Sequence, residues 1–218
     1  MTKSGVAGPS VLIYPQTTMK ASYSQTLRLI SGITFGSQTN FTLSWSLQSG
    51  DTDSLGLPPL NLAYRNLVIP PLTLQQGSSY TFRIQVENPS DPSSPGVAFQ
   101  TILVNSAPTL GSLYVNPSSG ITMSTVFAFK ILECSDDSLP LQYQFLVVSS
   151  LTPNVSRTLS LRTSINTYDG PLFKLDSHLI NAIIEGRVYD AYNDYTSKQR
   201  TINMATPTPA SVCESFQR

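Results

Sequence analysis

The stretch from Tyr80 to Glu87 alternates strictly between apolar and polar side chains. Every second residue, beginning with Tyr80, is large and apolar, and the residues between them are polar or charged. Successive side chains of a β-strand point to opposite faces, so this period of two predicts a strand that is buried on one face only. No segment of the chain shows a sustained helical period, and we therefore expect an all-β fold.

Further alternating runs lie on both sides of this stretch and suggest an internal duplication. A proline-containing joint at Ala107–Gly111 interrupts strand pairing, because proline lacks the donor that a sheet ladder needs. The runs Gln100–Pro108 and Gln199–Pro207 each end in a small residue and a proline after the same strand-turn-strand pattern. We predict two tandem Ig/fibronectin-III-like β-sandwiches, at residues 1–106 and 107–207, with a tail at 208–218.

Two aromatic residues of the first module are predicted to be structural. Trp45, the only tryptophan, shares one face of an alternating run with Phe41, Leu43 and Leu47, and we expect it to fill the sandwich core. Tyr80 opens the next strand after a glycine, as in the tyrosine corner of Greek-key sandwiches. Its phenol is expected to form a hydrogen bond with backbone a few residues upstream.

The charge content excludes several kinds of partner. Charged residues make up 12 % of the chain, and 13 basic residues balance 13 acidic ones, without any Lys/Arg cluster. Binding to nucleic acids depends on neutralising phosphates, so we expect no such partner, and no electrostatic binding to anionic membranes. The sequence contains no apolar run long enough to span a bilayer, and its N-terminus lacks the apolar core of a signal peptide. The chain is then either cytosolic or an excerpt of a longer secreted chain, and we favour the excerpt because of its polar tail and its weakly charged, hydrogen-bonding surface.

The sequence offers few groups for catalysis. His178 is the only histidine, and we expect it to be exposed or to cap a turn rather than to act as a base. Cys134 and Cys213 are compatible with one disulfide or with two free thiols, and they belong to no CxxC pair. We therefore predict no enzymatic activity, no catalytic residue and no cofactor.

Loop carboxylates were weighed as calcium ligands, because calcium binds proteins through converging oxygens. The best candidates are Asp190, Asn193 and Asp194 in a loop between two strands; the pairs Asp51/Asp53 and Asp136/Asp137 are weaker still. The spacing matches no calcium-loop signature, and Asp and Asn commonly form turns by bonding to their own backbone. We favour the turn and predict no metal site.

Two triplets match the acceptor pattern for N-glycosylation, one at Asn40 and one at Asn154. In a secreted sandwich rich in serine and threonine, both are candidate sites. Glycans could also be ligands, since Tyr189, Tyr192 and Tyr195 cluster around the loop at Asp190–Asp194. A carbohydrate-binding sandwich is therefore the alternative function.

Three pieces of the chain, in the right order, resemble the receptor-for-egg-jelly (REJ) region of polycystin-1-like proteins. The first is Leu74–Arg83. The second combines Ala107-Pro108, Gly111, Val115, Pro117–Gly120 and Thr125–Phe127, and the third is Asp137–Phe145. The resemblance implies tandem fibronectin-III-like sandwiches in the ectodomain of a membrane protein, often one displayed on cilia or gametes.

The function that this resemblance implies is structural. We expect a module for adhesion, assembly or force transmission on the extracellular face of the plasma or ciliary membrane, as part of a longer chain. Its partners would be protein modules of the same or a neighbouring chain, with glycans as a further class.

Overall fold

The computed structural model describes residues 8–14, 19–35, 40–50, 64–89, 91–149, 155–173 and 181–206. All regular secondary structure in these residues is β-strand. The contacts divide the chain into two compact units, Met1–Ser106 and Ala107–Arg218. The tail at 208–218, His178, Cys213 and Asn154 lie outside the described residues.

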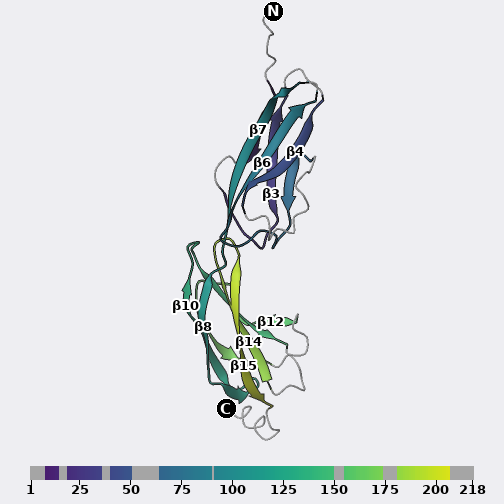
Figure 1. Ribbon diagram of the computed structural model, residues 1–218. Coiled ribbons are helices and arrows are strands. Elements are labelled where there is room, and N and C mark those ends of the chain that lie inside the picture. Colours follow the sequence, from purple (N-terminus) through teal and green to yellow (C-terminus); the bar gives the residue numbers. More distant parts are fainter. Residues whose placement is uncertain are drawn as a thin grey trace, which may run out of the picture. The chain divides into compact units, whose positions relative to one another are not determined.

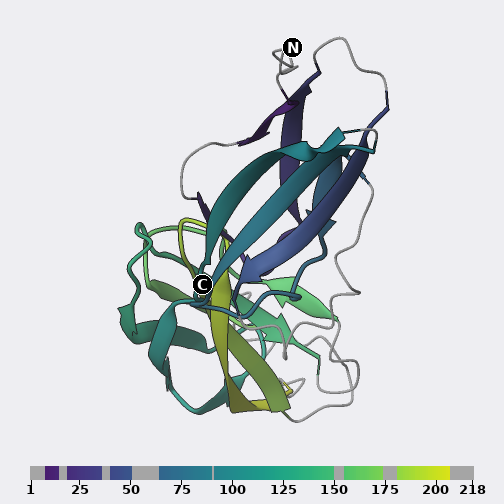
Figure 2. The same ribbon diagram turned by 45° about the horizontal axis from the view of Figure 1, so that its top comes forward.

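The first unit consists of two sheets (Figure 1). One sheet has the antiparallel order β1-β3-β5, made of β1 (Ser10–Tyr14), β3 (Leu27–Thr34) and β5 (Asn66–Ile69). The other has the order β2-β7-β6-β4, made of β2 (Met19–Ala21), β7 (Asp91–Val104), β6 (Ser79–Asn88) and β4 (Thr42–Ser49). Figure 2 shows the teal strands β6 and β7 beside the blue β4 in one layer.

The second unit repeats this plan with one added strand. Its smaller sheet has the order β13-β10-β8, made of β13 (Thr167–Pro171), β10 (Val126–Ser135) and β8 (Thr109–Asn116). Its larger sheet has the order β12-β11-β14-β15-β9, made of β12 (Ser156–Thr158), β11 (Gln142–Val148), β14 (Asn181–Tyr189), β15 (Tyr195–Ala205) and β9 (Ser119–Ile121).

The strand order identifies both units as Ig/fibronectin-III-like sandwiches. In the smaller sheet of each unit, one central strand pairs with two neighbours: β3 with β1 and β5 in the first unit, and β10 with β8 and β13 in the second. In the other sheet, the first strand of the last hairpin pairs with its partner and with an earlier strand: β6 with β7 and β4, and β14 with β15 and β11. This arrangement of two antiparallel sheets is that of the immunoglobulin and fibronectin type III folds. The predicted fold class is confirmed.

The core of the first unit lies where the alternating pattern placed it. The side chains of Tyr80, Phe82, Ile84 and Val86 on β6 are fully buried, while the intervening side chains are partly exposed. Trp45 on β4 is 1 % exposed, and its indole N–H donates a hydrogen bond to the Tyr64 carbonyl oxygen at 3.0 Å. Trp45 therefore fills the core and satisfies its only polar atom, as predicted.

Tyr80 forms the expected corner. Its phenol oxygen accepts a hydrogen bond from the Gln75 N–H at 3.1 Å, five residues upstream. Between the two residues, Gly77 has a φ of +73°, a left-handed conformation that glycine adopts without strain. Gly50 packs on the other side, where a Cβ atom would lie 2.4 Å from the Tyr80 ring. The phenol thus fixes the segment that leads into β6, as predicted.

Replacing Tyr80 with phenylalanine keeps the buried ring and removes only the hydroxyl. The Gln75 N–H then loses its partner, so we expect a loss of about 1–1.5 kcal/mol in the free energy of unfolding. Urea denaturation followed by Trp45 fluorescence measures this loss. The matched control is Tyr114→Phe, whose side chain is 48 % exposed, and which should change the stability by less than about 0.5 kcal/mol. Equal stability of Tyr80→Phe and the wild type would contradict the corner's role.

The second unit has its own aromatic core. Phe127 and Phe129 on β10 and Phe145 on β11 are at most 1 % exposed. The Phe129 ring centroid lies 6.2 Å from that of Phe127, 6.0 Å from that of Phe145 and 5.9 Å from that of Tyr168 on β13. The ring of Phe129 thus joins the two sheets of this unit, and it contacts all three of the neighbouring rings.

Candidate interaction surfaces

The loop between β14 and β15 is organised by one buried carboxylate. Tyr189 pairs with Tyr195 across the hairpin, and Asp190–Asp194 form the loop. Oδ1 of Asp190 accepts hydrogen bonds from the N–H groups of Tyr192 at 2.8 Å and Asp194 at 3.0 Å. Asp190 and Asp194 are 1 % and 0 % exposed. The loop is therefore closed by an aspartate turn that satisfies its own backbone.

A side chain from a distant segment secures this loop. Nη1 of Arg162 donates to Oδ1 of Asn193 at 2.8 Å, and its guanidinium lies 4.0 Å from the centroid of the Tyr189 ring. Asn193 itself has a φ of +66°, a conformation that asparagine tolerates better than most residues. Arg162 could not be predicted from the sequence, because its contacts join residues about thirty positions apart and no local pattern marks them.

The stacking continues across the hairpin. The rings of Tyr189 and Tyr195 lie 5.1 Å apart between centroids, and the Arg187 guanidinium lies 5.0 Å from the Tyr195 ring. We call this set, Arg162–Tyr189–Tyr195–Arg187, the Arg–Tyr stack. The Tyr189 hydroxyl donates to Oε1 of Gln144 on β11 at 3.0 Å, and Glu185 pairs with Arg187 at 2.5 Å. These cation–π and hydrogen-bonding contacts tie β11, β14 and β15 to the loop.

Hydrogen bonds within the protein already engage two of the calcium candidates, Asp190 and Asn193. Oδ1 of Asp190 already accepts two backbone hydrogen bonds, and Asn193 is held by Arg162, a cation that disfavours a second cation nearby. Among the described residues there is no group of three or more His, Cys, Asp or Glu side chains that could hold a metal ion. The contacts give Asp190 and Asn193 a structural role, and the expected absence of a metal site stays a prediction.

Replacing Asp190 with alanine removes the acceptor of two buried N–H groups. We expect a loss of about 2–3 kcal/mol, since unpaired buried donors cost more than the net value of their bonds. Chemical denaturation followed by far-UV circular dichroism measures this loss. The matched control is Asp169→Ala on the exposed side of β13, with an expected change of less than about 0.5 kcal/mol. A stable Asp190→Ala variant would show that the loop does not depend on this carboxylate.

The tyrosines considered for glycan binding are largely occupied within the fold. Tyr189 is 9 % exposed, and Arg162 covers one face of its ring. Tyr195 is 41 % exposed, and the Arg187 guanidinium lies over its ring. A sugar would have to displace these cations to stack on the rings. The arrangement favours a structural role for Tyr189, and the carbohydrate-binding alternative stays a prediction.

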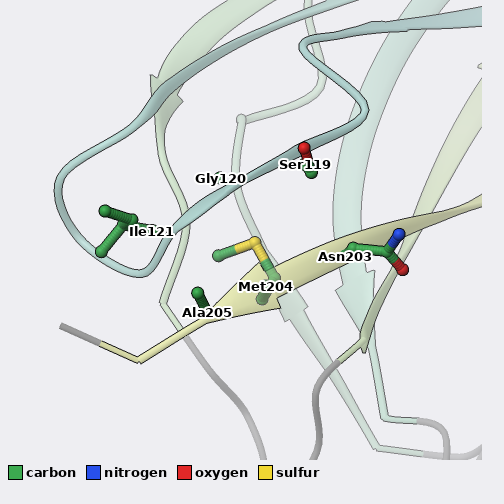
Figure 3. Close-up of a pocket in the computed structure, with 6 residues that line it drawn as sticks. All are labelled: Ser119, Gly120, Ile121, Asn203, Met204 and Ala205. Carbon is green, nitrogen blue, oxygen red and sulfur yellow. The ribbon is translucent and has the colours of Figure 1, made fainter. Parts of the chain in front are cut away.

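An open hollow of about 340 Å³ lies where β9 pairs in parallel with the end of β15. Figure 3 shows the residues that line it on these two strands: Ser119, Gly120, Ile121, Asn203, Met204 and Ala205. None of these side chains titrates or acts as a nucleophile near neutral pH, apart from a serine hydroxyl without a base among them. The described residues that line the hollow therefore supply no general acid or base.

Of the two glycosylation candidates, Asn40 lies within the described residues. It is exposed and lies two residues before the start of β4, and Thr42, the third residue of the triplet, is also exposed. An oligosaccharyltransferase needs this access to the acceptor side chain. Glycosylation at Asn40 stays a prediction, as does that at Asn154.

Cys134 on β10 forms no disulfide with any other residue that the structure describes. Burial raises the pKa of this thiol above its ordinary value, which disfavours the reactive thiolate near neutral pH. The predicted alternatives for Cys134 and Cys213 remain open, because Cys213 lies outside the described residues.

The part of the chain that the structure describes contains no helix long and apolar enough to cross a bilayer.

Nearly the whole chain matches the sequence model of a known domain family. The sequence model of the REJ domain matches residues 7–217. The mouse protein described as "Polycystin family receptor for egg jelly" is 39 % identical over 46 residues, which are 21 % of this chain and 2 % of the mouse protein. The chain thus spans a very small part of that relative.

Solved structures with similar folds have very low sequence identity. Domains FN1–FN3 of chicken CNTN1 are 10 % identical, with a TM-score of 0.47 over 91 % of this chain and 68 % of theirs. Murine CEACAM1b is 9 % identical, with a TM-score of 0.34 over 92 % of this chain and all of its own. The assignment of fold rests on the strand order within each unit.

Proposed function

Since this chain belongs to the REJ domain family, we propose that it is a structural and interaction module of a longer cell-surface protein, and that it has no enzymatic activity. The match over residues 7–217 is the single observation that carries this proposal. The relative in mouse is described as a receptor, and its short matching segment supports a place in an ectodomain. The side chains of the described residues add support, because they are engaged in packing and turn formation rather than gathered around a reactive group.

Within this role, we propose force transmission as the specific task. In both units a short strand near the start pairs in parallel with the last strand: β2 with β7, and β9 with β15. The backbone supports each pair, since Asn105 N–H donates to the Ala21 carbonyl at 2.8 Å and Thr122 N–H donates to the Ala205 carbonyl at 3.0 Å.

Parallel pairing matters because of the direction of load. When tension pulls the short strand near the start of a unit and the last strand in opposite directions, the two parallel strands slide along each other. Their hydrogen bonds are then loaded in shear and must break together, whereas bonds in a peeled hairpin break one at a time. Forced unfolding follows the barrier to unfolding rather than the equilibrium stability. The parallel pairs therefore favour a high resistance to stretching.

Single-molecule stretching between the chain ends tests this proposal. Asn203→Pro removes the N–H that donates to the Ser118 carbonyl at 3.2 Å, and so weakens the parallel pair of the second unit. A loss of about 1–1.5 kcal/mol from the barrier raises the unfolding rate under force about fivefold to tenfold. The control, Ser156→Pro, places a proline in the short edge strand β12, outside the loaded pair.

The two variants separate mechanical strength from general stability. We expect Asn203→Pro to unfold at a lower force than the wild type, and Ser156→Pro to unfold at a force close to that of the wild type. Equal unfolding forces for all three chains would contradict the task of force transmission. The wider proposal, an extracellular module displayed on the plasma or ciliary membrane, would fail if the full-length protein were found inside the cell.

A further inference from the structure

The outer face of the sheet β1-β3-β5 exposes four large apolar side chains. Leu12 is 42 % exposed, Tyr14 48 %, Ile30 53 % and Val68 46 %. The residues that alternate with them on the same strands, such as Ile13, Leu29 and Leu67, are buried in the core. The sheet therefore presents apolar residues on both sides, whereas a sheet with one solvated face is usually polar there.

These side chains form one continuous surface, which we call the apolar face. Tyr14 lies directly opposite Ile30, and Leu12 lies opposite Gly32. The Tyr14 ring covers Gly32 so closely that a Cβ atom there would lie 2.8 Å from the ring carbon Cε2. Val68 on β5 is a diagonal neighbour of Ile30, because Ile30 lies opposite Asn66. The four side chains thus adjoin one another over three strands.

The second unit shows that the fold does not require such a surface. On the equivalent sheet β8-β10-β13, Lys130 lies opposite both Tyr114 and Thr167. The next row of the same face places Ala128 between Asn116 and Asp169. The central rows of this face carry charged and amide side chains, with Tyr114 as their one large ring. The apolar residues of the first unit are therefore a property of that unit, and exposed apolar patches of this kind mark interaction sites.

Among the described residues of β1, β3 and β5 and the residue that precedes β5, all charged side chains are positive. Arg28 on β3 and Arg65 next to β5 are both exposed, and Arg28 lies opposite Val68. The strands β1, β3 and β5 contain no acidic residue. Next to Val68, Arg65 also lines an open hollow of about 480 Å³ together with Asn66 and Tyr64, a residue that is 70 % exposed. The apolar face is thus continuous with a hollow that has an arginine at its rim.

From this combination we infer that the apolar face, with Arg28 and Arg65, is a docking site for a protein segment that presents apolar side chains flanked by carboxylates. Leu12, Ile30 and Val68 offer no hydrogen bond to a sugar, which argues against a glycan. A second copy would place the same arginine-bearing surface against itself without any carboxylate from these strands, which argues against self-association. The inference rests on the proposed interaction role and adds the chemistry of the partner.

Panning a random-peptide display library on the immobilised chain tests this inference. We expect the enriched peptides to combine apolar residues with Asp or Glu. Their binding should weaken at least about tenfold on Ile30→Thr, the size of effect typical for a central contact residue, and also on the double variant Arg28→Glu/Arg65→Glu. The matched control is Phe99→Thr, since Phe99 is 56 % exposed on the other sheet of the same unit and should leave binding unchanged.

The remaining outcomes overturn the inference. Peptides without acidic residues, peptides that bind Ile30→Thr and the wild type equally, or a failure to enrich any peptide would each contradict it. So would a concentration-dependent dimer in sedimentation velocity that Ile30→Thr abolishes, or a glycan-array signal lost on the same substitution. Melting temperatures within about 3 °C of the wild type show that the variants are folded. Failure of the docking site would leave the stretching experiment, and the proposal it tests, unaffected.

Discussion

Replacing Trp45 with alanine is expected to destabilise the first unit by about 3–5 kcal/mol, the range for removing a large buried aromatic side chain. Trp45 is 1 % exposed on β4 and packs among the buried residues of β3 and β6. Its loss leaves a cavity and also removes the donor to the Tyr64 carbonyl. Urea denaturation followed by far-UV circular dichroism should show one part of the transition moving to a lower denaturant concentration.

The control for this experiment is Phe99→Ala. Phe99 is an aromatic residue of the same unit, but its side chain is 56 % exposed, so we expect a change of less than about 0.5 kcal/mol. If Trp45→Ala were as stable as Phe99→Ala, the indole could not be the centre of a core. If the whole circular dichroism transition of Trp45→Ala moved to lower urea, the two units would unfold as one cooperative body.

Replacing Phe129 with alanine is expected to have an equally large effect on the second unit, about 3–5 kcal/mol. The Phe129 ring is 1 % exposed and lies within 6.2 Å, between centroids, of the rings of Phe127, Phe145 and Tyr168. Since Trp45 belongs to the first unit, its fluorescence reports on that unit alone. We expect the fluorescence midpoint to stay at the wild-type value, while part of the circular dichroism transition moves to lower urea.

A matched aromatic control is Tyr114→Ala on the exposed face of the neighbouring strand β8, where the ring is 48 % exposed. Its effect should be less than about 1 kcal/mol. A fall in the fluorescence midpoint of Phe129→Ala equal to the fall in its circular dichroism midpoint would mean that the cores are not separate.

The sequence predicted the strands with one buried face well, because their pattern is local. The runs that became β4, β6, β10 and β11 all alternate with period two, and their inward residues form the two cores. Tyr80 could be predicted because the corner needs only a tyrosine, an upstream backbone donor and a glycine between them.

Strand ends were harder to predict, since proline and glycine obscure them. The turn-forming residues of the segment 88–96 indicate a loop, but β7 begins at Asp91, and the register with β6 shifts between Val86 and Asn88. This irregularity lets the strand include Pro92 and Pro95, which the simple rule against prolines in strands excludes. The apolar residues Phe173 and Leu175 suggest a strand there, but β13 covers Thr167–Pro171 and ends before Phe173. Within β13 only Gly170 is fully buried, so no alternation of large apolar residues marks this strand in the sequence.

Of the candidate surfaces, only the parts formed by neighbouring residues could be predicted from the sequence. The turn formed by Asp190 could be predicted from its own neighbours, and its hydrogen bonds to Tyr192 and Asp194 agree with that expectation. Arg162 and the apolar face depend on strands brought together by the fold. No spacing in the sequence places Tyr14 beside Ile30, or Arg162 over Tyr189.

Hydrogen exchange of the Trp45→Ala variant, measured by mass spectrometry on fragments of the native chain, tests the central claim of two separate cores most directly. We predict that amide protection falls in β3, β4, β6 and β7, and that it stays at the wild-type level in β10, β11 and β14. An equal fall of protection in the strands of both units would contradict the claim.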